Sequence, residues 1–269
     1  MSYKAILFEE KDNIGILTLN MPDKLNMMSL ELIEELRDCF AALRNNYEIR
    51  AVILKAAGRA FCAGLDLKEG VFEAAGKSNL GDPQYKYKIQ QAFSDTVVNM
   101  RRCPQPIIAV IKGSAVGAGF SLTLACDVRV AGESARFNAA YIKVGLSGGD
   151  VGSTYFLPRL IGLSRASEYL YTGDFIDANT ADKIGLVSRL VSDDKADEVA
   201  LQIASAMLKN SPFGLRMTKE SINANVDAPG IESALHIENR TQVLALLSDD
   251  FKEGTQAFLE KRTPQYKDR

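Results

Sequence analysis

The segment "PIIAVIKGSAVGAGFSLTLACDVRVAG" (residues 106–132) decides the fold class. An apolar, β-branched run of strand length leads into glycines and other small residues, followed by a helical pattern and a second strand-like run. Small residues at the turn would let a ligand approach the backbone, and N–H groups at the start of a helix favour negative charge. The glycine spacing does not fit GxGxxG and no Walker lysine follows, so neither nucleotide motif is predicted. A tight strand-to-helix turn without a ligand is the alternative interpretation.

The same alternation of strands and helices recurs on both sides of this segment. Strand-like runs at residues 16–21 and 51–57 flank a helical pattern at residues 29–46. Residues 135–162 repeat the order of strand, small-residue loop and helix. Residues 68–88 have weak periodicity and a Gly-Asp-Pro breaker, which predicts a surface excursion.

From about residue 199 the pattern is helical throughout. We therefore predict an α/β core over residues 1–198, which would hold the site, and a helical C-terminal region over residues 199–269. Apolar residues of that region, such as Leu244, Leu246 and Leu247, would leave an exposed patch in a monomer, so we expect a homo-oligomer.

Composition disfavours several function classes. The formal charge is −2 over 269 residues, so we expect neither nucleic acid nor a membrane surface as a partner. No apolar run approaches the roughly 18 residues that span a bilayer, and no signal-peptide pattern opens the chain, so a cytoplasmic location is expected. The four cysteines lie far apart and are interpreted as buried free thiols. The single histidine, His236, excludes most Ser–His–Asp schemes and any His-rich metal site, so no metal is predicted.

A second glycine-bearing stretch, "GRAFCAGLDLKEG" (residues 58–70), also follows a strand-like run. Its turn around Gly64 would expose further backbone N–H groups. Taken alone, it is also consistent with an ordinary tight turn. Together, however, the two stretches provide two separate backbone donors, which is what an oxyanion hole needs to hold an enolate or tetrahedral oxyanion.

Five segments carry a specific resemblance. They are "AFCAGLDLKE" (60–69), "IKGSAVGAGFSLTLACDVRVA" (111–131), "PRLIGLSRASEYLYTG" (158–173), "ADKIGLVSRLV" (181–191) and "FLEKRTPQY" (258–266). In this order they resemble the crotonase, or enoyl-CoA hydratase/isomerase, family. The resemblance implies a spiral of repeated ββα units with a helical C-terminal trimerisation region, often in a dimer of trimers. It also implies acyl-CoA thioester substrates held as enolates in an oxyanion hole, with no cofactor besides the CoA of the substrate.

The resemblance also assigns individual residues. The catalytic oxyanion donors are the backbone N–H groups of Leu65 and Ala118, and loss of one such donor costs about 3–4 kcal/mol of transition-state stabilisation. The predicted substrate-binding residues are Lys24, Ala63, Gly64, Asp66, Leu67, Lys68, Gly117 and Tyr141. Among them, Ala63 and Leu67 match positions whose backbone groups hold the adenine of CoA. The two lysines are candidates for its phosphates or ring edge, with ordinary solvation as the alternative.

Two departures from the family pattern bear on the reaction. Hydratases of this family resemble one another in two catalytic glutamates that position and share protons with the added water. This chain has Ser121 at the first of these positions and Tyr141 at the second. A hydratase of the two-carboxylate type is therefore disfavoured, and Tyr141 is expected to shape the acyl pocket.

Asp150 lies among glycines in "GLSGGDVGS" (residues 145–153), a setting that by itself is typical of a turn. Aligned on "DVGSTYFLPR", it matches catalytic aspartates of dienoyl-CoA isomerase and of the ring-epoxide isomerase of phenylacetate breakdown. The nucleophilic aspartate of 4-chlorobenzoyl-CoA dehalogenase stands at the same position. That enzyme's partner histidine and tryptophan are replaced here by Ser94 and Ile142, which disfavours dehalogenation.

We therefore predict an enoyl-CoA double-bond isomerase in which Asp150 is the single catalytic acid and base. Burial beneath an acyl chain would raise its pKa from about 4 towards the range useful for proton exchange. One alternative is a hydratase or CoA-ester hydrolase in which Asp150, with Tyr141 or Ser147, positions water. The non-enzyme alternative is an acyl-CoA-binding or RNA-binding relative, and the lack of a Lys/Arg-rich stripe disfavours RNA.

Overall fold

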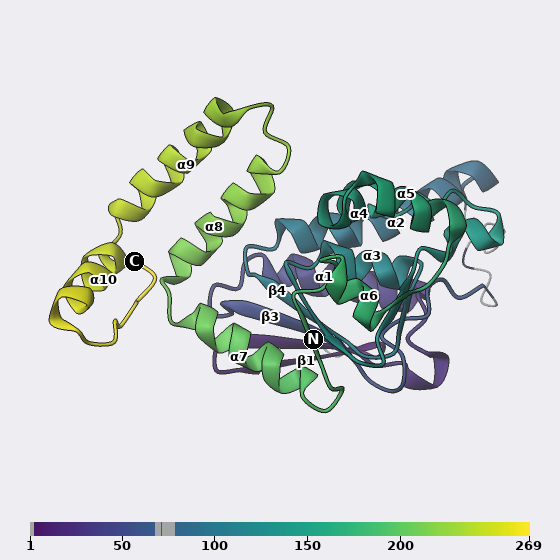
Figure 1. Cartoon of the computed structure of the whole chain (residues 1–269), viewed down its shortest axis with the longest axis horizontal. Coiled ribbons are helices and arrows are strands. Elements are labelled where there is room, and N and C mark those ends of the chain that lie inside the picture. The colour runs from purple at the N-terminus through teal and green to yellow at the C-terminus, as the bar shows by residue number, and fades with distance from the viewer. Residues whose placement is uncertain (1–2, 68–70, 72–78) are drawn as a thin grey trace.

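A six-stranded sheet forms the centre of the chain in the computed structural model, which describes residues 3–67, 71 and 79–269 (Figure 1). In spatial order its strands are β1 (Ile6–Lys11), β2 (Ile14–Leu19), β3 (Ala51–Ala56), β4 (Ile107–Ile111), β6 (Val128–Gly132) and β9 (Arg189–Val191). The first two strands are antiparallel, and all neighbours from β2 onward are parallel. A second sheet contains β5 (Ser114–Val116), β7 (Arg136–Asn138) and β8 (Ile176–Asp177). The strand–helix alternation predicted from the sequence is confirmed.

Helices cover both sheets and continue beyond them. In chain order they are α1 (Leu30–Leu43), α2 (Asp82–Arg102), α3 (Ala118–Ala125), α4 (Ser153–Ile161), α5 (Leu163–Thr172), α6 (Ala178–Lys183), α7 (Ala196–Leu208), α8 (Pro212–Asn225), α9 (Ile231–Leu246) and α10 (Asp249–Glu260), with the short helices η1 (Pro22–Lys24) and η3 (Ala140–Val144).

The prediction of a surface excursion over residues 68–88 is wrong for residues 82–88. Residues 82–88 form the first two turns of α2, while residues 68–70 and 72–78 lie outside the described residues. The Gly-Asp-Pro sequence starts this helix, because Pro83 needs no N–H partner in the first turn and Gly81 is the N-cap.

Both faces of the main sheet are buried, which explains why its central strands are largely apolar, with β4 apolar at every position. On β3, Val52 and Leu54 belong to the core cluster shared with α1, α2 and α3, whereas Ile53 belongs to a cluster on the opposite face. The opposite face is covered by α7, whose Ala196 and Ala200 are fully buried. The predicted division at residue 199 falls inside this helix, which packs on β3, β4 and β6.

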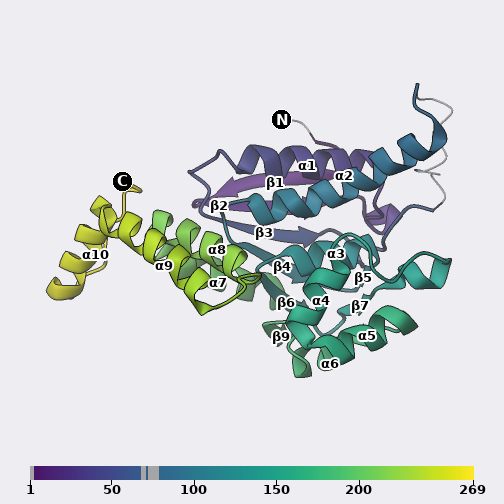
Figure 2. The same ribbon diagram turned by 90° about the horizontal axis from the view of Figure 1, so that it is seen from above.

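The last three helices, α8 to α10, form an arm that extends away from the sheets, as both ribbon views show (Figures 1 and 2). A buried ion pair ties the arm to the core, because Lys219 on α8 lies with its Nζ 2.8 Å from Asp127 Oδ2. Beyond that contact the arm exposes large apolar side chains, including Leu247 and Phe258, which are 74% and 83% exposed to solvent. Every described helix is too short or too polar to cross a bilayer.

Candidate active site

A cavity of about 580 Å³ opens between α2, the N-terminus of α3 and η3. Eight of the predicted site residues line it: Ala63, Gly64, Leu65, Leu67, Gly117, Ala118, Tyr141 and Asp150. The other lining residues are Pro83, Lys86, Tyr87, Gln90, Phe93, Val116, Ala140, Val144 and Leu146, so most of the wall is apolar. Residues distant in sequence therefore converge on one pocket.

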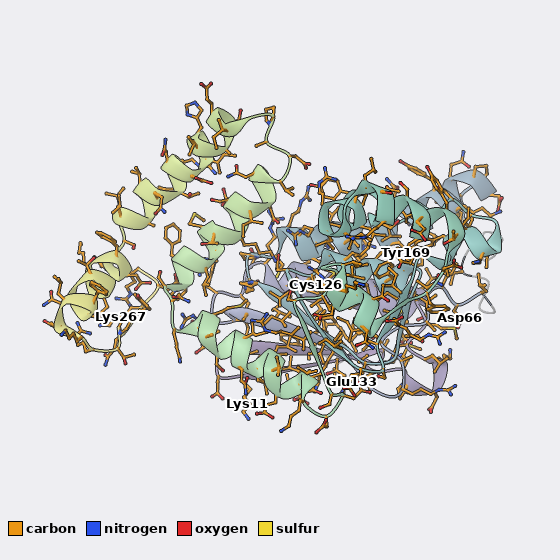
Figure 3. All side chains as sticks on the ribbon, viewed as in Figure 1. Lys11, Asp66, Cys126, Glu133, Tyr169 and Lys267 are labelled. Atoms are coloured by element: carbon orange, nitrogen blue, oxygen red, sulfur yellow. The ribbon has the colours of Figure 1, made fainter. Side chains whose placement is uncertain are left out.

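Two of the other three predicted substrate-binding residues, Asp66 and Lys24, lie outside the cavity lining. Asp66 is buried and Lys24 is exposed at the end of η1, and neither lines the cavity. Lys24 is next to Leu25, whose carbonyl accepts the Ala63 N–H at 3.1 Å. Lys68 lies outside the described residues. Figure 3 shows Asp66 at the end of the core away from the arm.

The two glycine-bearing stretches meet backbone to backbone. The N–H of Cys62 donates to Ser114 O at 3.0 Å, and that of Val116 donates to Cys62 O at 2.9 Å. Gly64 has φ +89°, and a Cβ added there would lie 2.9 Å from Val116 O and 3.8 Å from Gly117 Cα. No side chain fits between the loops, so glycine is required for their contact.

Two backbone N–H groups at this junction have no acceptor. Within the described residues, neither the Leu65 N–H nor the Ala118 N–H donates a hydrogen bond. Ala118 is the first residue of α3, so its N–H lacks an intrahelical partner and lies at the positive end of the helix dipole. Leu65 is held on both sides, since Gly64 O accepts from Met28 N at 2.8 Å and Asp66 N donates to Met28 O at 3.3 Å. Two such donors in one cavity can stabilise a negatively charged oxygen.

Asp150 places a carboxyl group in the same cavity. Its Oδ1 accepts two hydrogen bonds, from Gln90 Nε2 at 2.5 Å and from Val151 N at 2.8 Å. Its Oδ2 accepts none within the described part of the chain. Burial raises the pKa of Asp150 above its ordinary value of 3.8, and the two hydrogen bonds oppose that effect only in part. The carboxyl group is thus shifted towards proton exchange while one oxygen is left for a ligand.

The residue after Asp150 has an unfavourable backbone conformation. Val151 is buried and has φ +44°, in the left-handed region that a β-branched residue rarely adopts. Such a conformation costs about 1–3 kcal/mol and persists where the surroundings enforce it. The Val151 N–H itself donates to the carboxylate of Asp150. The backbone beside Asp150 is therefore held in a conformation that costs stability.

The two positions that depart from the hydratase pattern bond to each other. Ser121 Oγ and Tyr141 Oη lie 2.6 Å apart, both buried. Ser121 also donates its single hydroxyl proton to the carbonyl oxygen of Asp150 at 3.3 Å, so Tyr141 must donate to Ser121. Burial raises the pKa of Tyr141, which keeps its hydroxyl protonated. The pair is a structural support beneath Asp150, and the Tyr141 proton is already engaged.

Two residues of the site have no counterpart among the sequence predictions. One is Gln90, because a glutamine on a helix has no pattern that distinguishes it from a solvated one. The other is Asn26, which is fully buried and bonds to three backbone groups, namely Met21 N, Ala57 O and Ala60 O. It ties the turn after η1 to the loop that leads to Gly64. Within the described residues, no group of three or more His, Cys, Asp or Glu side chains is arranged to hold a metal.

The relatives of this chain decide its family. The family model described as enoyl-CoA hydratase/isomerase matches residues 9–269. The chain belongs to this family. It is 36% identical over 260 residues to a protein of Mycobacterium bovis named probable enoyl-CoA hydratase, covering 96% of this chain and 90% of that protein. It is 33% identical over 261 residues to the 1,2-epoxyphenylacetyl-CoA isomerase of Escherichia coli, covering 97% of both. The crystal structure of an enoyl-CoA hydratase from Bacillus anthracis matches with a TM-score of 0.90 at 35% identity, covering 99% of this chain and 100% of that one.

Membership confirms the crotonase fold and an enzyme of the crotonase type. It also implies an acyl-CoA thioester as the substrate class. The enzymes to which the chain is similar are named hydratase in some cases and isomerase in others, so membership alone leaves the reaction open. The choice between the two reactions depends on the groups that line the cavity.

Proposed function

We propose that this enzyme is an enoyl-CoA double-bond isomerase that converts a 3-enoyl-CoA into the conjugated 2-enoyl-CoA. One observation carries the proposal. Asp150 is the only carboxyl group among the described residues that line the cavity, and it shares that cavity with the free N–H groups of Leu65 and Ala118. A 1,3-proton shift needs one group that alternates between base and acid, together with stabilisation of the enolate between the two steps.

The reaction follows from these positions. Asp150 Oδ2 removes a proton from the α-carbon. The electron pair of that C–H bond forms a double bond between the α-carbon and the thioester carbon, and the carbonyl π pair moves onto the oxygen. The N–H groups of Leu65 and Ala118 stabilise the oxygen of this dienolate. The protonated Asp150 then returns the proton to the γ-carbon as the carbonyl group re-forms and the double bond shifts from β–γ to α–β, so the product has the composition of the substrate and no water is consumed.

The Ser121–Tyr141 pair supports isomerisation over hydration. Hydration needs a water molecule that is oriented and deprotonated beside the β-carbon. The hydroxyl proton of Tyr141 is directed to Ser121, and Ser121 in turn donates to the Asp150 carbonyl. Neither hydroxyl is therefore available as a proton donor to water, and neither has the basicity of a carboxylate.

The CoA moiety would be held at the other end of the cavity. Ala63 and Leu67 line it, and Leu67 is 65% exposed. We propose that their backbone groups hold the adenine, as the family resemblance implies. Lys24 and Lys68 are proposed to contact the phosphates or the ring edge. No cofactor besides the CoA of the substrate enters this scheme.

The arm is proposed to form a homotrimer, or a dimer of trimers, through its exposed apolar side chains. These include Ile222, Val226, Ile231, Leu235, Val243, Leu244, Leu246, Leu247, Phe251, Phe258 and Leu259. Burial of such a set would remove a large apolar patch from water. Sedimentation equilibrium should give three or six times the mass of the chain, and a monomer would contradict this part of the proposal.

The reaction is tested by mass spectrometry of 3-enoyl-, 2-enoyl- and saturated acyl-CoAs incubated with the enzyme in heavy water. A double-bond-shifted product with deuterium in its acyl chain, no added water and dependence on Asp150 supports the isomerase. A mass gain of one water would instead show a hydratase, and release of free CoA a hydrolase. Binding of CoA esters without any change would show a non-catalytic relative. Normal turnover by Asp150→Asn would refute the assigned role of Asp150.

A further inference from the structure

We infer that Gln90 is a positioning residue for the acid/base of this enzyme, since it fixes the Asp150 carboxylate so that Oδ2 alone faces the substrate. The inference rests on the proposed isomerase function, because it specifies how a single carboxylate is held for two proton transfers.

Both hydrogen bonds to the Asp150 carboxylate go to the same oxygen. The side-chain torsion of an aspartate is broad and nearly two-fold, so an unrestrained carboxylate would present either oxygen in a range of orientations. Gln90 Nε2 and Val151 N both donate to Oδ1, at 2.5 and 2.8 Å. The Val151 donor comes from the adjacent peptide and restrains the carboxylate from one side only. Gln90 approaches from a different element, α2, and completes the restraint.

Gln90 is well placed for this task because α2 itself is fixed. Ile89 and Phe93 on the same helix are buried in the main core cluster. Tyr87, Gln90 and Phe93 follow one another at three-residue spacing and all line the cavity. The helix that shapes the pocket wall therefore also holds the amide against Asp150. A substrate that packs on this wall would lie beside Gln90, the residue that orients the Asp150 carboxylate.

The choice of a neutral donor is chemically consistent with a base. An ion pair with lysine or arginine would favour the ionised carboxylate strongly and weaken it as a proton acceptor. Among the described residues, the other titratable groups of this cavity are Lys86, Tyr87 and Tyr141. Lys86 pairs with Asp82 at 2.9 Å, the Tyr141 hydroxyl is bound to Ser121, and Asp150 forms no ion pair with any residue that the structure describes. An amide fixes geometry while leaving burial to dominate the proton affinity.

The test compares Gln90→Leu with Gln91→Leu in the oligomeric enzyme as isolated. Gln91 is the next residue on the same helix and is exposed, and its side chain makes no hydrogen bond within the described residues, so it is a matched control. For 3-enoyl-CoA isomerisation, Gln90→Leu should lower kcat roughly tenfold to a hundredfold with KM within about twofold, since a misaimed group mainly affects the chemical step. Gln91→Leu should behave as the unmodified enzyme.

The pH profile separates positioning from a general loss of structure. A hydrogen-bond donor stabilises the ionised carboxylate of Asp150 and so lowers its pKa. Removal of the Gln90 amide should therefore move the acidic limb of the plot of kcat against pH to higher pH by about one pH unit. Gln90→Glu provides a second variant should the leucine variant not fold. Two carboxyl groups at that separation cannot both ionise, so one proton is shared and the acidic limb moves up further.

The outcomes are distinguishable. Loss of kcat together with the upward shift of the acidic limb, in either variant, supports the inference. If Asp150→Asn is inactive while Gln90→Leu and Gln90→Glu match Gln91→Leu in kcat and pH profile, the inference is overturned and the proposed function stands. If Asp150→Asn turns over normally, both are overturned.

Discussion

Substitution of Gly64 by alanine tests whether the close contact between the two glycine loops supports catalysis, as distinct from the loss of stability that backbone strain alone would cause. An alanine at this position meets two penalties. The first is its φ of +89°, which costs a residue with a side chain about 1–3 kcal/mol. The second is crowding, because the new Cβ would lie 2.9 Å from Val116 O, a backbone atom that cannot rotate away. The loop must therefore shift by several tenths of an ångström.

That shift acts on the neighbouring residue. The Leu65 N–H follows Gly64 directly and would move away from the thioester oxygen it is proposed to bind. Loss of one oxyanion donor lowers kcat by about 10²–10³. We expect Gly64→Ala to lower kcat about a hundredfold while retaining the fold.

Gly162→Ala is the matched control for strain. Gly162 joins α4 to α5 with φ +82°, and an added Cβ there would have nothing within 4 Å. It should lose a similar 1–3 kcal/mol of stability through strain alone and keep its kcat. Gly117→Ala is intermediate, since its Cβ would lie 3.6 Å from Tyr141 Cε1, an ordinary contact, at φ +53°.

The assay combines steady-state isomerisation of 3-enoyl-CoA with urea unfolding of the three variants. If Gly64→Ala and Gly162→Ala have equal kcat values, the close approach of the two loops does not position an oxyanion donor and the reasoning fails. The same conclusion follows if Gly64→Ala loses stability but no activity.

Three further variants, one of them with a surface control, test other parts of the structure. Burial raises the pKa of Asp150, so the ionised carboxylate destabilises the folded state. Asp150→Asn should therefore abolish turnover and raise Tm at pH 7 by a few degrees. The difference in Tm should vanish as the pH falls below about 4, where the carboxyl group is protonated in both the folded and the unfolded state. Tyr141→Phe removes the donor to Ser121 and should lower the free energy of unfolding by about 1–2 kcal/mol in urea titration, with kcat reduced less than tenfold if Tyr141 only shapes the pocket. Lys219→Met leaves Asp127 with one fewer partner in a buried cluster and should cost about 3 kcal/mol of stability, whereas the exposed pair partner Lys252→Met should cost under about 0.5 kcal/mol.

Strong local patterns made much of the fold predictable. Residues 106–132 contain the first strand, the small-residue turn, the helix and the last strand in the predicted order, because burial on both faces leaves these strands mostly apolar. The start of α2 was not predictable in the same way. Asp-Pro is compatible with both a turn and a helix N-terminus, and packing of Tyr85 and Ile89 on the core selects the helix.

The site was predictable where backbone geometry depends on residue type. Glycines at positions 64 and 117 are needed for the close approach of two loops, and that need is visible as small residues in the sequence. The Ser121–Tyr141 hydrogen bond could not be predicted from the sequence, because each of these two positions was interpreted only by the absence of the glutamate that the family pattern places there. In the structure their hydroxyl oxygens lie 2.6 Å apart, so the two side chains satisfy each other.

Asp150 shows why the catalytic assignment could not be completed from the chain alone. Its neighbours Gly149 and Gly152 are equally suited to a turn and to an active-site loop. Asp150 does begin a turn, because its carbonyl oxygen accepts from Ser153 N at 2.9 Å. Three further features are tertiary or conformational and were not visible in the sequence: the unfavourable φ of Val151, the amide of Gln90 from a distant helix, and burial that raises the pKa of the carboxyl group. A strained backbone and a partly desolvated carboxylate both lower stability, and they support the proposed role of Asp150 in proton transfer.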